Sequence, residues 1–513
     1  MPSSHGSSGG KKKSSSSGSP VKLTIDDALA RLEYGPFHTR LLIMGGIATM
    51  ANCMAVMASF FFPQDFDGGN LSDFQAASLT AILFLGTFMG VFFVNFASDS
   101  FGRRSTFLVC AATTSLFGFV GGLMPNYAGI MIMRFLVGFG LGGTNAPFYY
   151  LAEFVPHQQR GVTLLKLGYA WALGSIVTPF LGLATLDKDG LGPPVFLFLC
   201  SIPSVISLVA GFMILPESPR WLMSKGQNEV ALSILRDAAI INHQDPWAIC
   251  PQSAHLMRGG KTKSKWKAIT RLFRKEWRRM IMCLLPTFLV VDFLYYSYVQ
   301  LIHMTISNTD GAEDDFEFVW IGVSAIAELA GIAIAIFAID RVGRVPTQAV
   351  SYLVAGILIM GIGIGRNVED NTTDDRIATS YLFYLCFVAR MFITLATNVT
   401  WVHTVEILPK KIRATFHITA HALASLGGAA SAYHMVTPGM KFSVVAIVVG
   451  VITLLTSLLT WTFPETKTLA LGNSVSRSIS RDGVFTNRDN EEEKSMLSRS
   501  SDDSTIDPSL GSL

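Results

Sequence analysis

Asp99-Ser100-Phe101-Gly102-Arg103 is followed 241 residues later by Asp340-Arg341-Val342-Gly343-Arg344, the same acid-x-x-Gly-Arg pattern. A second pattern, Glu153-x-x-Pro156-x-x-x-Arg160, recurs 253 residues later as Glu406-x-x-Pro409-x-x-x-Arg413. A third, Pro216-Glu217-Ser218, recurs 248 residues later as Pro464-Glu465-Thr466. Three patterns in the same order at similar offsets indicate that the chain contains a duplicated unit.

Apolar runs of membrane-spanning length surround these repeats. Half of the 513 residues are hydrophobic, only 15% are charged, and the mean hydropathy is +0.42. About 20 apolar residues cross a hydrocarbon layer of about 30 Å as a helix. The predicted spans are 41–62, 76–97, 105–124, 127–152, 162–185, 194–215, 279–304, 317–339, 346–365, 378–402, 414–437 and 441–463. We therefore predict an all-α membrane protein with twelve transmembrane helices in two pseudo-symmetric six-helix bundles.

A polar and strongly basic segment divides the twelve spans into six and six. The predicted organisation is an N-terminal tail (1–40), a first bundle (41–215), a central loop (216–278), a second bundle (279–463) and a C-terminal tail (464–513). The last of these is rich in Ser, Arg and acidic residues, a composition typical of disorder.

Basic and acidic side chains fall in alternate loops. Lys and Arg mark one set, as in the central loop, whereas Asp and Glu mark the other, as in 310–315. Because Lys and Arg are enriched in cytoplasmic loops, both termini are predicted to be cytoplasmic. Asn70 and Asn371 begin Asn-x-Ser/Thr sequons in loops placed outside, so both are candidate glycosylation sites. Outside-facing sequons favour the plasma membrane, although a vesicular or vacuolar membrane fits equally well.

The repeated acids and arginines lie at the predicted cytoplasmic ends of spans, where they can form a latch. Such groups cap helix termini and pair with each other while still reaching water. Pairs that form in one conformation and break in another bias a rocking equilibrium between two halves. The alternative is that these charges only fix the topology. The predicted latch residues are Asp99, Gly102, Arg103, Arg104, Glu153, Arg160, Asp340, Gly343, Arg344, Glu406 and Arg413.

These motifs resemble signatures shared by sugar porters and organic-ion transporters of the major facilitator superfamily. The residues that carry the resemblance are Asp99 with Gly102-Arg103-Arg104, Tyr150 to Pro156 with Arg160-Gly161, and Pro216 to Leu222. The similarity runs from about residue 25 to 469 and implies twelve helices around a central cavity with alternating access. One position departs from the pattern, because Asn95 stands where the first loop motif usually has glycine.

The second half resembles organic-cation and organic-anion transporters more than sugar porters. Ser324 to Gly331 is similar to their eighth helix and Asp292 to Tyr296 to their seventh, whereas the Gln-Gln-x-Ser-Gly pattern of sugar porters is missing. The loop after the first span has only about 13 residues, as in the synaptic-vesicle-protein-like group. Ser425 stands where cation carriers tend to have Asp and anion carriers Arg, so the resemblance leaves the charge of the substrate open.

Two acidic residues lie about halfway along predicted spans, where an ionisable side chain is costly and a candidate for function. Asp292 and Glu328 are both candidates to bind a cation or to carry a proton. For Glu328 the alternative is a structural partner of a buried hydroxyl or arginine. Arg134 and Arg390, early in the fourth and tenth spans, are candidates to neutralise buried acids. Aromatic rings beside Asp292 would suit an organic cation. The other candidate site residues are Tyr295, Tyr296, Asn52, Asn145, Trp171, Asn398 and His421.

The predicted function is secondary-active or facilitative transport of a small organic solute, with an organic ion preferred, by alternating access. The alternatives are a hexose transporter and a transporter-like sensor or binding protein without flux. The chain has no ATP-binding or enzymatic motif and no spacing typical of a metal or cofactor site, so no enzyme, metal or cofactor is predicted. A net charge of +3 gives no support for nucleic-acid binding. The predicted partners of the monomer are the solute, the lipid bilayer and a candidate co-transported proton.

Overall fold

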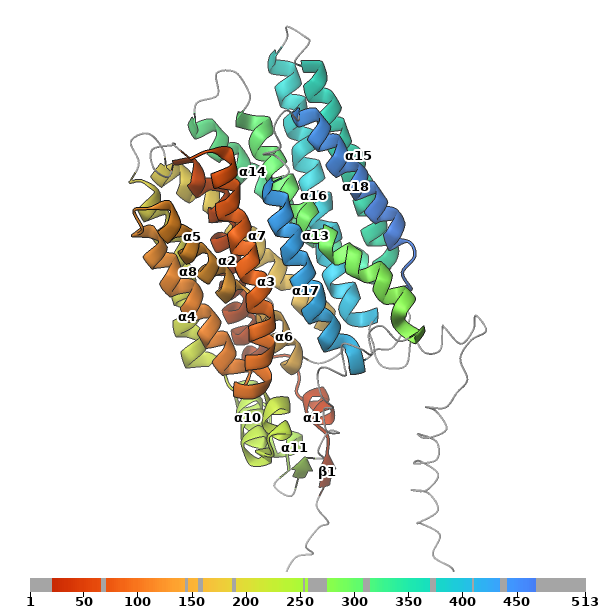
Figure 1. Ribbon diagram of the computed structural model, residues 1–513. Helices are drawn as coiled ribbons and strands as arrows, with labels where there is room; N and C mark the ends of the chain where they lie inside the picture. Colours follow the sequence, from red (N-terminus) through yellow and green to blue (C-terminus); the bar gives the residue numbers. More distant parts are fainter. Residues whose placement is uncertain are drawn as a thin grey trace, which may run out of the picture.

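Two bundles of long helices stand side by side in the computed structural model (Figure 1). The structure describes residues 21–65, 71–143, 146–155, 160–186, 191–251, 254–256, 275–307, 314–369, 375–407, 410–433 and 441–466. Outside these residues lie the sequons at Asn70 and Asn371, the candidate Asn145, residues 1–20 of the predicted N-terminal tail and residues 467–513 of the C-terminal tail.

The first bundle contains seven helical elements in the described chain. They are α2 (Pro36–Asp65), α3 (Asp73–Phe101), α4 (Arg103–Gly122), α5 (Tyr127–Leu141), α6 (Ala146–Phe154), α7 (Arg160–Leu186) and α8 (Pro193–Ile214). α5 and α6 together correspond to the fourth predicted span. Capping side chains set the start of two of these helices: Ser72 forms a capping box with Gln75 at α3, and Asn126 accepts a hydrogen bond from Gly129 N at α5.

The second bundle contains six helices within the described residues. They are α13 (Lys275–Ser307), α14 (Asp314–Arg341), α15 (Arg344–Glu369), α16 (Asp375–Ile407), α17 (Lys410–Tyr433) and α18 (Phe442–Thr460). Eleven segments of the described chain are long and apolar enough to cross a membrane. The remaining predicted span, 414–437, corresponds to α17. α17 is less apolar because it carries His417, His421 and several small residues. The predicted all-α architecture of two six-span bundles is confirmed.

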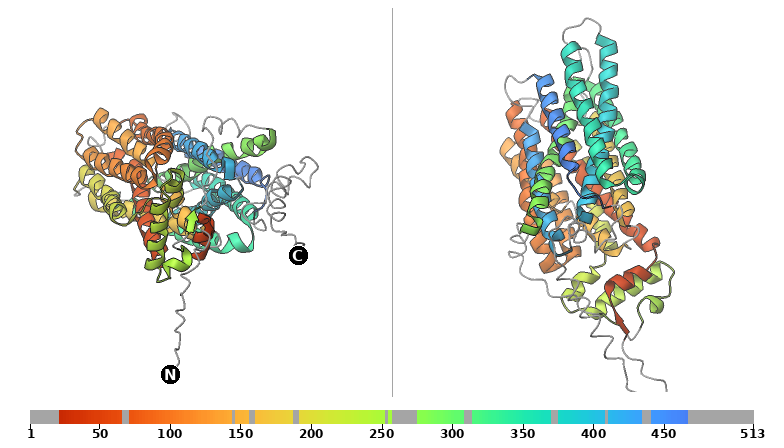
Figure 2. Two further views of the ribbon diagram at one scale, coloured as in Figure 1. Left: turned by 90° about the horizontal axis from the view of Figure 1, so that it is seen from below. Right: turned by 90° about the vertical axis from the view of Figure 1, so that its right-hand side faces the viewer.

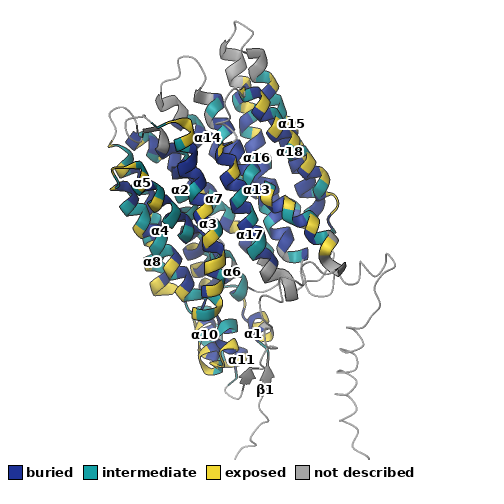
Figure 3. Cartoon of the chain, in the orientation of Figure 1, coloured by how far each residue is buried: buried dark blue, intermediate teal, exposed yellow. Residues whose placement is uncertain are grey.

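The outer surface of both bundles is apolar. Large hydrophobic side chains such as Phe92, Phe212 and Leu458 are exposed on it, as the yellow outer faces in Figure 3 indicate. Polar groups inside the spans are instead satisfied locally, because many Ser and Thr hydroxyls donate to the carbonyl four residues earlier; Thr178 to Gly174 O, at 2.7 Å, is an example. Such a surface is what a lipid-facing helix bundle requires.

The segment between the bundles, predicted as a polar loop, contains further elements. α9 (Pro219–Ser224), α10 (Asn228–Ile241), α11 (Pro246–Ile249) and β2 (Ala254–Leu256) lie below the first bundle in Figure 1. The N-terminal residues join them: β1 (Val21–Leu23) pairs in parallel with β2, and α1 (Ile25–Arg31) packs its apolar face on α10 (Figure 2). We call this end of the molecule the α10 end and the opposite one the far end.

Glycine lets α3 and α5 approach each other at backbone distance. A Cβ atom on Gly138 would collide with Leu83 O, and one on Gly86 or Gly90 would collide with a carbonyl oxygen of α5. Small residues at helix crossings permit such close packing in membranes. The departure at Asn95 does not open this contact, because its side chain donates to Val91 O of its own helix at 2.8 Å.

We expect Gly138→Ala to destabilise the protein by about 1–3 kcal/mol, as overpacking of a tight contact does. The displaced group is a backbone carbonyl, which cannot turn aside as a side chain can. Gly361→Ala is the matched control, since its new methyl group would lie 3.9 Å from Leu385 Cδ1. Thermal unfolding of the purified variants measures the effect, and equal melting temperatures for the two variants would contradict the packing argument.

Candidate functional site

A cavity of about 190 Å³ lies between the two bundles. This volume is of the order of an apolar protein cavity of about 150 Å³ that binds benzene. Helices of both bundles contribute to it, chiefly α2, α3 and α7 from the first and α13, α16 and α17 from the second. Its polar lining residues are Thr49, Thr87, Asp292, Thr394, Thr397, Asn398, His417, His421 and Ser425.

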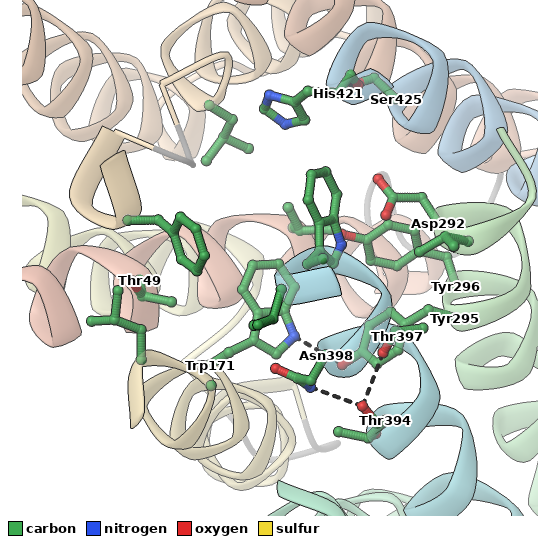
Figure 4. Close-up of a pocket in the computed structure, with 18 of the residues that line it drawn as sticks. Thr49, Trp171, Asp292, Tyr295, Tyr296, Thr394, Thr397, Asn398, His421 and Ser425 are labelled. Carbon is green, nitrogen blue, oxygen red and sulfur yellow. Dashed lines mark hydrogen bonds between the residues drawn. The ribbon is translucent and has the colours of Figure 1, made fainter. Parts of the chain in front are cut away.

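Asp292 is the only Asp or Glu among the described residues that line this cavity, and no Lys or Arg lines it. Its carboxylate has no hydrogen-bond or ion-pair partner in the described part of the chain. Tyr296 follows one turn later on α13 (Figure 4). The aromatic lining residues are Phe84, Phe148, Trp171, Tyr295, Tyr296 and Trp401. A single acid among aromatic rings gives the cavity the chemistry of a cation site.

Glu328 does not line the cavity. It is fully buried on α14 and forms an ion pair with Arg390 of α16 at 2.8 Å. Arg390 also donates to Ser324 Oγ at 2.8 Å and to Ser175 Oγ at 2.6 Å. Glu328 is therefore the partner of a buried arginine, Arg390, as the structural alternative predicted.

The Glu328–Arg390 pair is connected to the cavity through Tyr295. The Tyr295 hydroxyl donates to Glu328 Oε1 at 2.9 Å and accepts from Trp171 Nε1, also at 2.9 Å. Figure 4 shows Trp171 reaching Tyr295 at the edge of the cavity. Trp171 and Ser175 belong to α7 of the first bundle, whereas the other members belong to the second. The network therefore joins the halves directly behind the cavity.

The other predicted site residues divide between the cavity and elsewhere. Asn398 and His421 line the cavity, and Asn398 donates to Thr394 O at 2.8 Å. Asn52 lies instead in a small cavity inside the first bundle. Sequence reasoning missed Phe84 and Ser175, because a phenylalanine or a serine in an apolar span carries no signal of its own.

Aromatic contacts between the bundles close the cavity on its far side. Tyr296 packs against Phe84 and Phe60, with ring centroids 4.8 and 5.8 Å apart, and Phe61 packs against Phe318 at 5.8 Å. Nearer the far end, the hydroxyls of Ser78 and Tyr433 are 3.0 Å apart. Toward the α10 end the cavity is lined by Phe148, Leu164, Trp401 and His417, so it extends in that direction.

At the α10 end of the first bundle, the predicted latch residues form a cluster around Arg103. Its side chain donates to Asp99 Oδ1 at 3.0 Å and to Glu153 Oε1 at 3.4 Å. Glu217 accepts from the backbone N–H groups of Arg103 and Arg104 at 2.8 and 3.3 Å, which satisfies the first turn of α4. Gly102 has φ 101°, and a Cβ there would collide with the Glu217 carboxylate. Glycine is therefore required at this turn.

The second bundle repeats the cluster around Arg344. Its guanidinium contacts both oxygens of Glu406, at 2.8 and 3.1 Å, and lies 3.6 Å from Asp340 Oδ1. Glu465 accepts from the N–H groups of Arg344 and Val345 at 3.0 and 2.9 Å. Gly343, with φ 116°, takes the place of Gly102. The duplicated sequence thus gives a duplicated helix-end cluster.

Every described ion pair of these clusters lies within one bundle. In the described chain, the two clusters therefore hold helix ends together inside each half, and their role as a latch between conformations stays a prediction. The side chains of Arg160 and Arg413 lie outside the described residues. The first half approaches the second cluster at Gly161, where an added Cβ would lie 3.9 Å from Glu406 Oε1. Glu217 and Glu465 were absent from the predicted latch, although the repeated Pro-Glu-Ser/Thr pattern had pointed to them.

Comparisons with known proteins agree with this architecture. A model of the family described as "Sugar (and other) transporter" matches residues 43–474. Synaptic vesicle 2-related protein of Xenopus laevis is 28% identical over 428 residues, which are 79% of this chain and 73% of that protein. Organic cation/carnitine transporter 7 of Arabidopsis thaliana is 26% identical over 450 residues, 80% of this chain and 87% of that protein.

Solved structures agree in fold. The xylose transporter XylE from E. coli, in a partially occluded inward open conformation, superposes with a TM-score of 0.65 and 20% identity. The match covers 85% of this chain and 100% of that one. At this identity the likeness shows the major facilitator fold alone.

Proposed function

Because this chain belongs to the sugar (and other) transporter family, and is therefore a multi-pass transmembrane transporter, we propose that its solute is a small organic cation. The observation that carries the proposal is Asp292, the sole acid among the described lining residues of a cavity that has six aromatic lining residues and no described basic counter-charge. A carboxylate holds a cation by charge, and ring faces attract an ammonium group further. The name of the organic cation/carnitine relative gives independent support.

The proposed transport is alternating access at a site between the bundles. Basic loops at the α10 end support a cytoplasmic position for that end and for both termini. With this orientation the cavity extends toward the cytoplasm and the aromatic contacts close it from outside. We place the monomeric carrier in the plasma membrane, with a vesicular membrane as the alternative that the synaptic-vesicle relative supports.

Uptake of radiolabelled organic cations by the wild type and by Asp292→Asn tests the proposal. We expect Asp292→Asn to lower kcat/KM by about 10-fold to 100-fold, the range that a charge-assisted contact of about 1.5–3 kcal/mol gives. Asp237→Asn is the matched control, because Asp237 is exposed on α10 and the change in charge is the same. Full cation uptake by Asp292→Asn would remove this residue from substrate binding.

Hexose transport is the second candidate, because the Thr49, Thr87, Thr397 and Asn398 side chains could bind hydroxyl groups. In the same assay, competition by hexoses that does not depend on Asp292 would favour a sugar.

Asp292, His417 and His421 are the described acid and histidine side chains of the cavity. Uptake into proteoliposomes at two pH values, with and without a protonophore, therefore tests for a co-transported proton. Ligand-induced stabilisation without any flux would favour a sensor.

A further inference from the structure

Arg134 of α5 is buried inside the first bundle, and no carboxylate among the described residues pairs with it. It is 5% exposed, and its guanidinium lies 5.1 Å from the centre of the Phe62 ring. Within the described chain, one terminal nitrogen, NH2, has no hydrogen-bond partner and no carboxylate pairs with it. Arg134 was expected to neutralise a buried acid, and here it does not. An isolated cation at membrane depth is costly and calls for a counter-charge.

Arg134 lines a small cavity that has room for one compact guest. The cavity measures about 20 Å³ and is bounded by α2, α4, α5 and α8. Thr114 and Ser204 line it and also line a second cavity of about 20 Å³, which contains Asn52. One water-sized sphere needs about 10–15 Å³. Each cavity therefore suits a single water or a monatomic ion and is too small for a carboxylate or a phosphate.

Two hydroxyls beside Arg134 are free to donate. Most hydroxyls in the spans donate to their own helix, as Ser201 does to Leu197 O at 2.8 Å. Thr114 and Ser204 form no hydrogen bond with any described residue, and both lie in the cavity wall. A guanidinium and two unused hydroxyls thus surround one space that no described acid enters.

We propose that this cavity binds a halide, chloride under physiological conditions, as the counter-ion of Arg134. The guanidinium supplies the charge, and the hydroxyls of Thr114 and Ser204 supply neutral donors, so all the polar groups that are free favour an anion. Water alone would hydrate the guanidinium and leave its charge uncompensated. The halide is a resident ion of the first bundle and is distinct from the transported solute, whose cavity has other walls.

Thermal unfolding of the purified full chain in nanodiscs tests the site. Sodium chloride is titrated against sodium gluconate at constant ionic strength, with bromide as a second halide. We expect Tm to rise by roughly 2 °C for each tenfold increase in chloride above its dissociation constant, as ligand linkage requires. Equal melting temperatures in chloride and gluconate would overturn the proposal and would indicate that the cavity holds water only.

Two variants connect the chloride effect to this cavity. Arg134→Met removes the charge and is expected to abolish the chloride dependence. Cys200→Asp introduces a fixed carboxylate into the same wall and is expected to make the melting temperature independent of chloride while Arg134 stays. An undiminished chloride effect in both variants would place the ion elsewhere.

The anomalous signal of bromide in crystals of the wild type gives a readout that needs no variant. A peak beside the Arg134 guanidinium is expected, and a bromide-treated crystal without one would refute the site. Because neither Asp292 nor uptake enters these measurements, the halide site and the cation proposal can fail separately.

Discussion

Arg390→Met is expected to lower the free energy of unfolding by about 3–5 kcal/mol, the cost of leaving one member of a buried ion pair without its partner. Arg390 is 1% exposed and Glu328 0%, so neither can reach water if the other is removed. All the described hydrogen bonds of Glu328 go to Oε1, from Arg390, Ser175 and Tyr295. Loss of the guanidinium would therefore leave a buried charge held by two hydroxyls.

The double variant Glu328→Gln/Arg390→Met should recover most of this loss, because it removes both charges together. We expect its stability to lie within about 1–2 kcal/mol of the wild type, since neutral replacements of a buried pair are often well tolerated. Denaturant unfolding in detergent micelles measures both variants. Arg278→Met, at an exposed position of α13, is the control for loss of an arginine. Additive losses in the double variant would contradict the pairing.

The Glu328–Arg390 pair connects the cavity to hydrogen bonds that join the two bundles. Trp171 and Tyr295 present their rings to the cavity and their polar atoms to each other, and Tyr295 continues to Glu328. Ser175 connects the first half to the pair a second time through Arg390. A solute that moves either ring therefore changes hydrogen bonds that cross between the bundles. Differential contacts of this kind are what a population shift between conformations requires.

The sequence predicted the architecture well because the fold depends on features that are local or repeated. Apolar runs predict the spans. The Asp-x-x-Gly-Arg repeat shows that α3 of the first half and α14 of the second are equivalent helices. The helical pieces below the first bundle were missed for a physical reason. α10 is only 14 residues long, and its apolar residues belong to the same buried cluster as those of α1, about 200 residues earlier in the chain. Such short helices depend on tertiary packing rather than on their own propensity.

The candidate site was harder to predict because it depends on which way each helix faces. Asp292 and Glu328 looked alike in the sequence, each an acid halfway along a span. The structure turns Asp292 into the cavity and Glu328 toward Arg390, 62 positions away on another helix. When a helix is apolar on all sides, its hydropathy does not indicate which face points toward the cavity. Asn52 is a further case, since its side chain lines a small cavity inside its own bundle and not the cavity between the bundles.

Arg344→Ala is expected to lower the free energy of unfolding and the uptake rate more than Arg103→Ala does. The two arginines nevertheless hold equivalent positions in the repeat. Arg344 contacts both oxygens of Glu406, and the side chains are 13% and 11% exposed. Arg103 reaches only one oxygen of Glu153, at 3.4 Å, and those side chains are 28% and 19% exposed. Two-point contacts between an arginine and a carboxylate are the stronger kind, and exposure weakens a pair.

We expect a loss of about 2–4 kcal/mol in unfolding free energy for Arg344→Ala, and about 1 kcal/mol for Arg103→Ala. We expect the uptake rates of the variants to follow the same order, because each cluster holds together helix ends of one bundle. Arg344→Lys keeps the charge but not the two-point contact, so an intermediate effect is expected. Unfolding and initial uptake rates of the three variants measure the order. Equal effects of Arg344→Ala and Arg103→Ala would mean that charge alone matters at these positions, and the positive-inside role would then suffice.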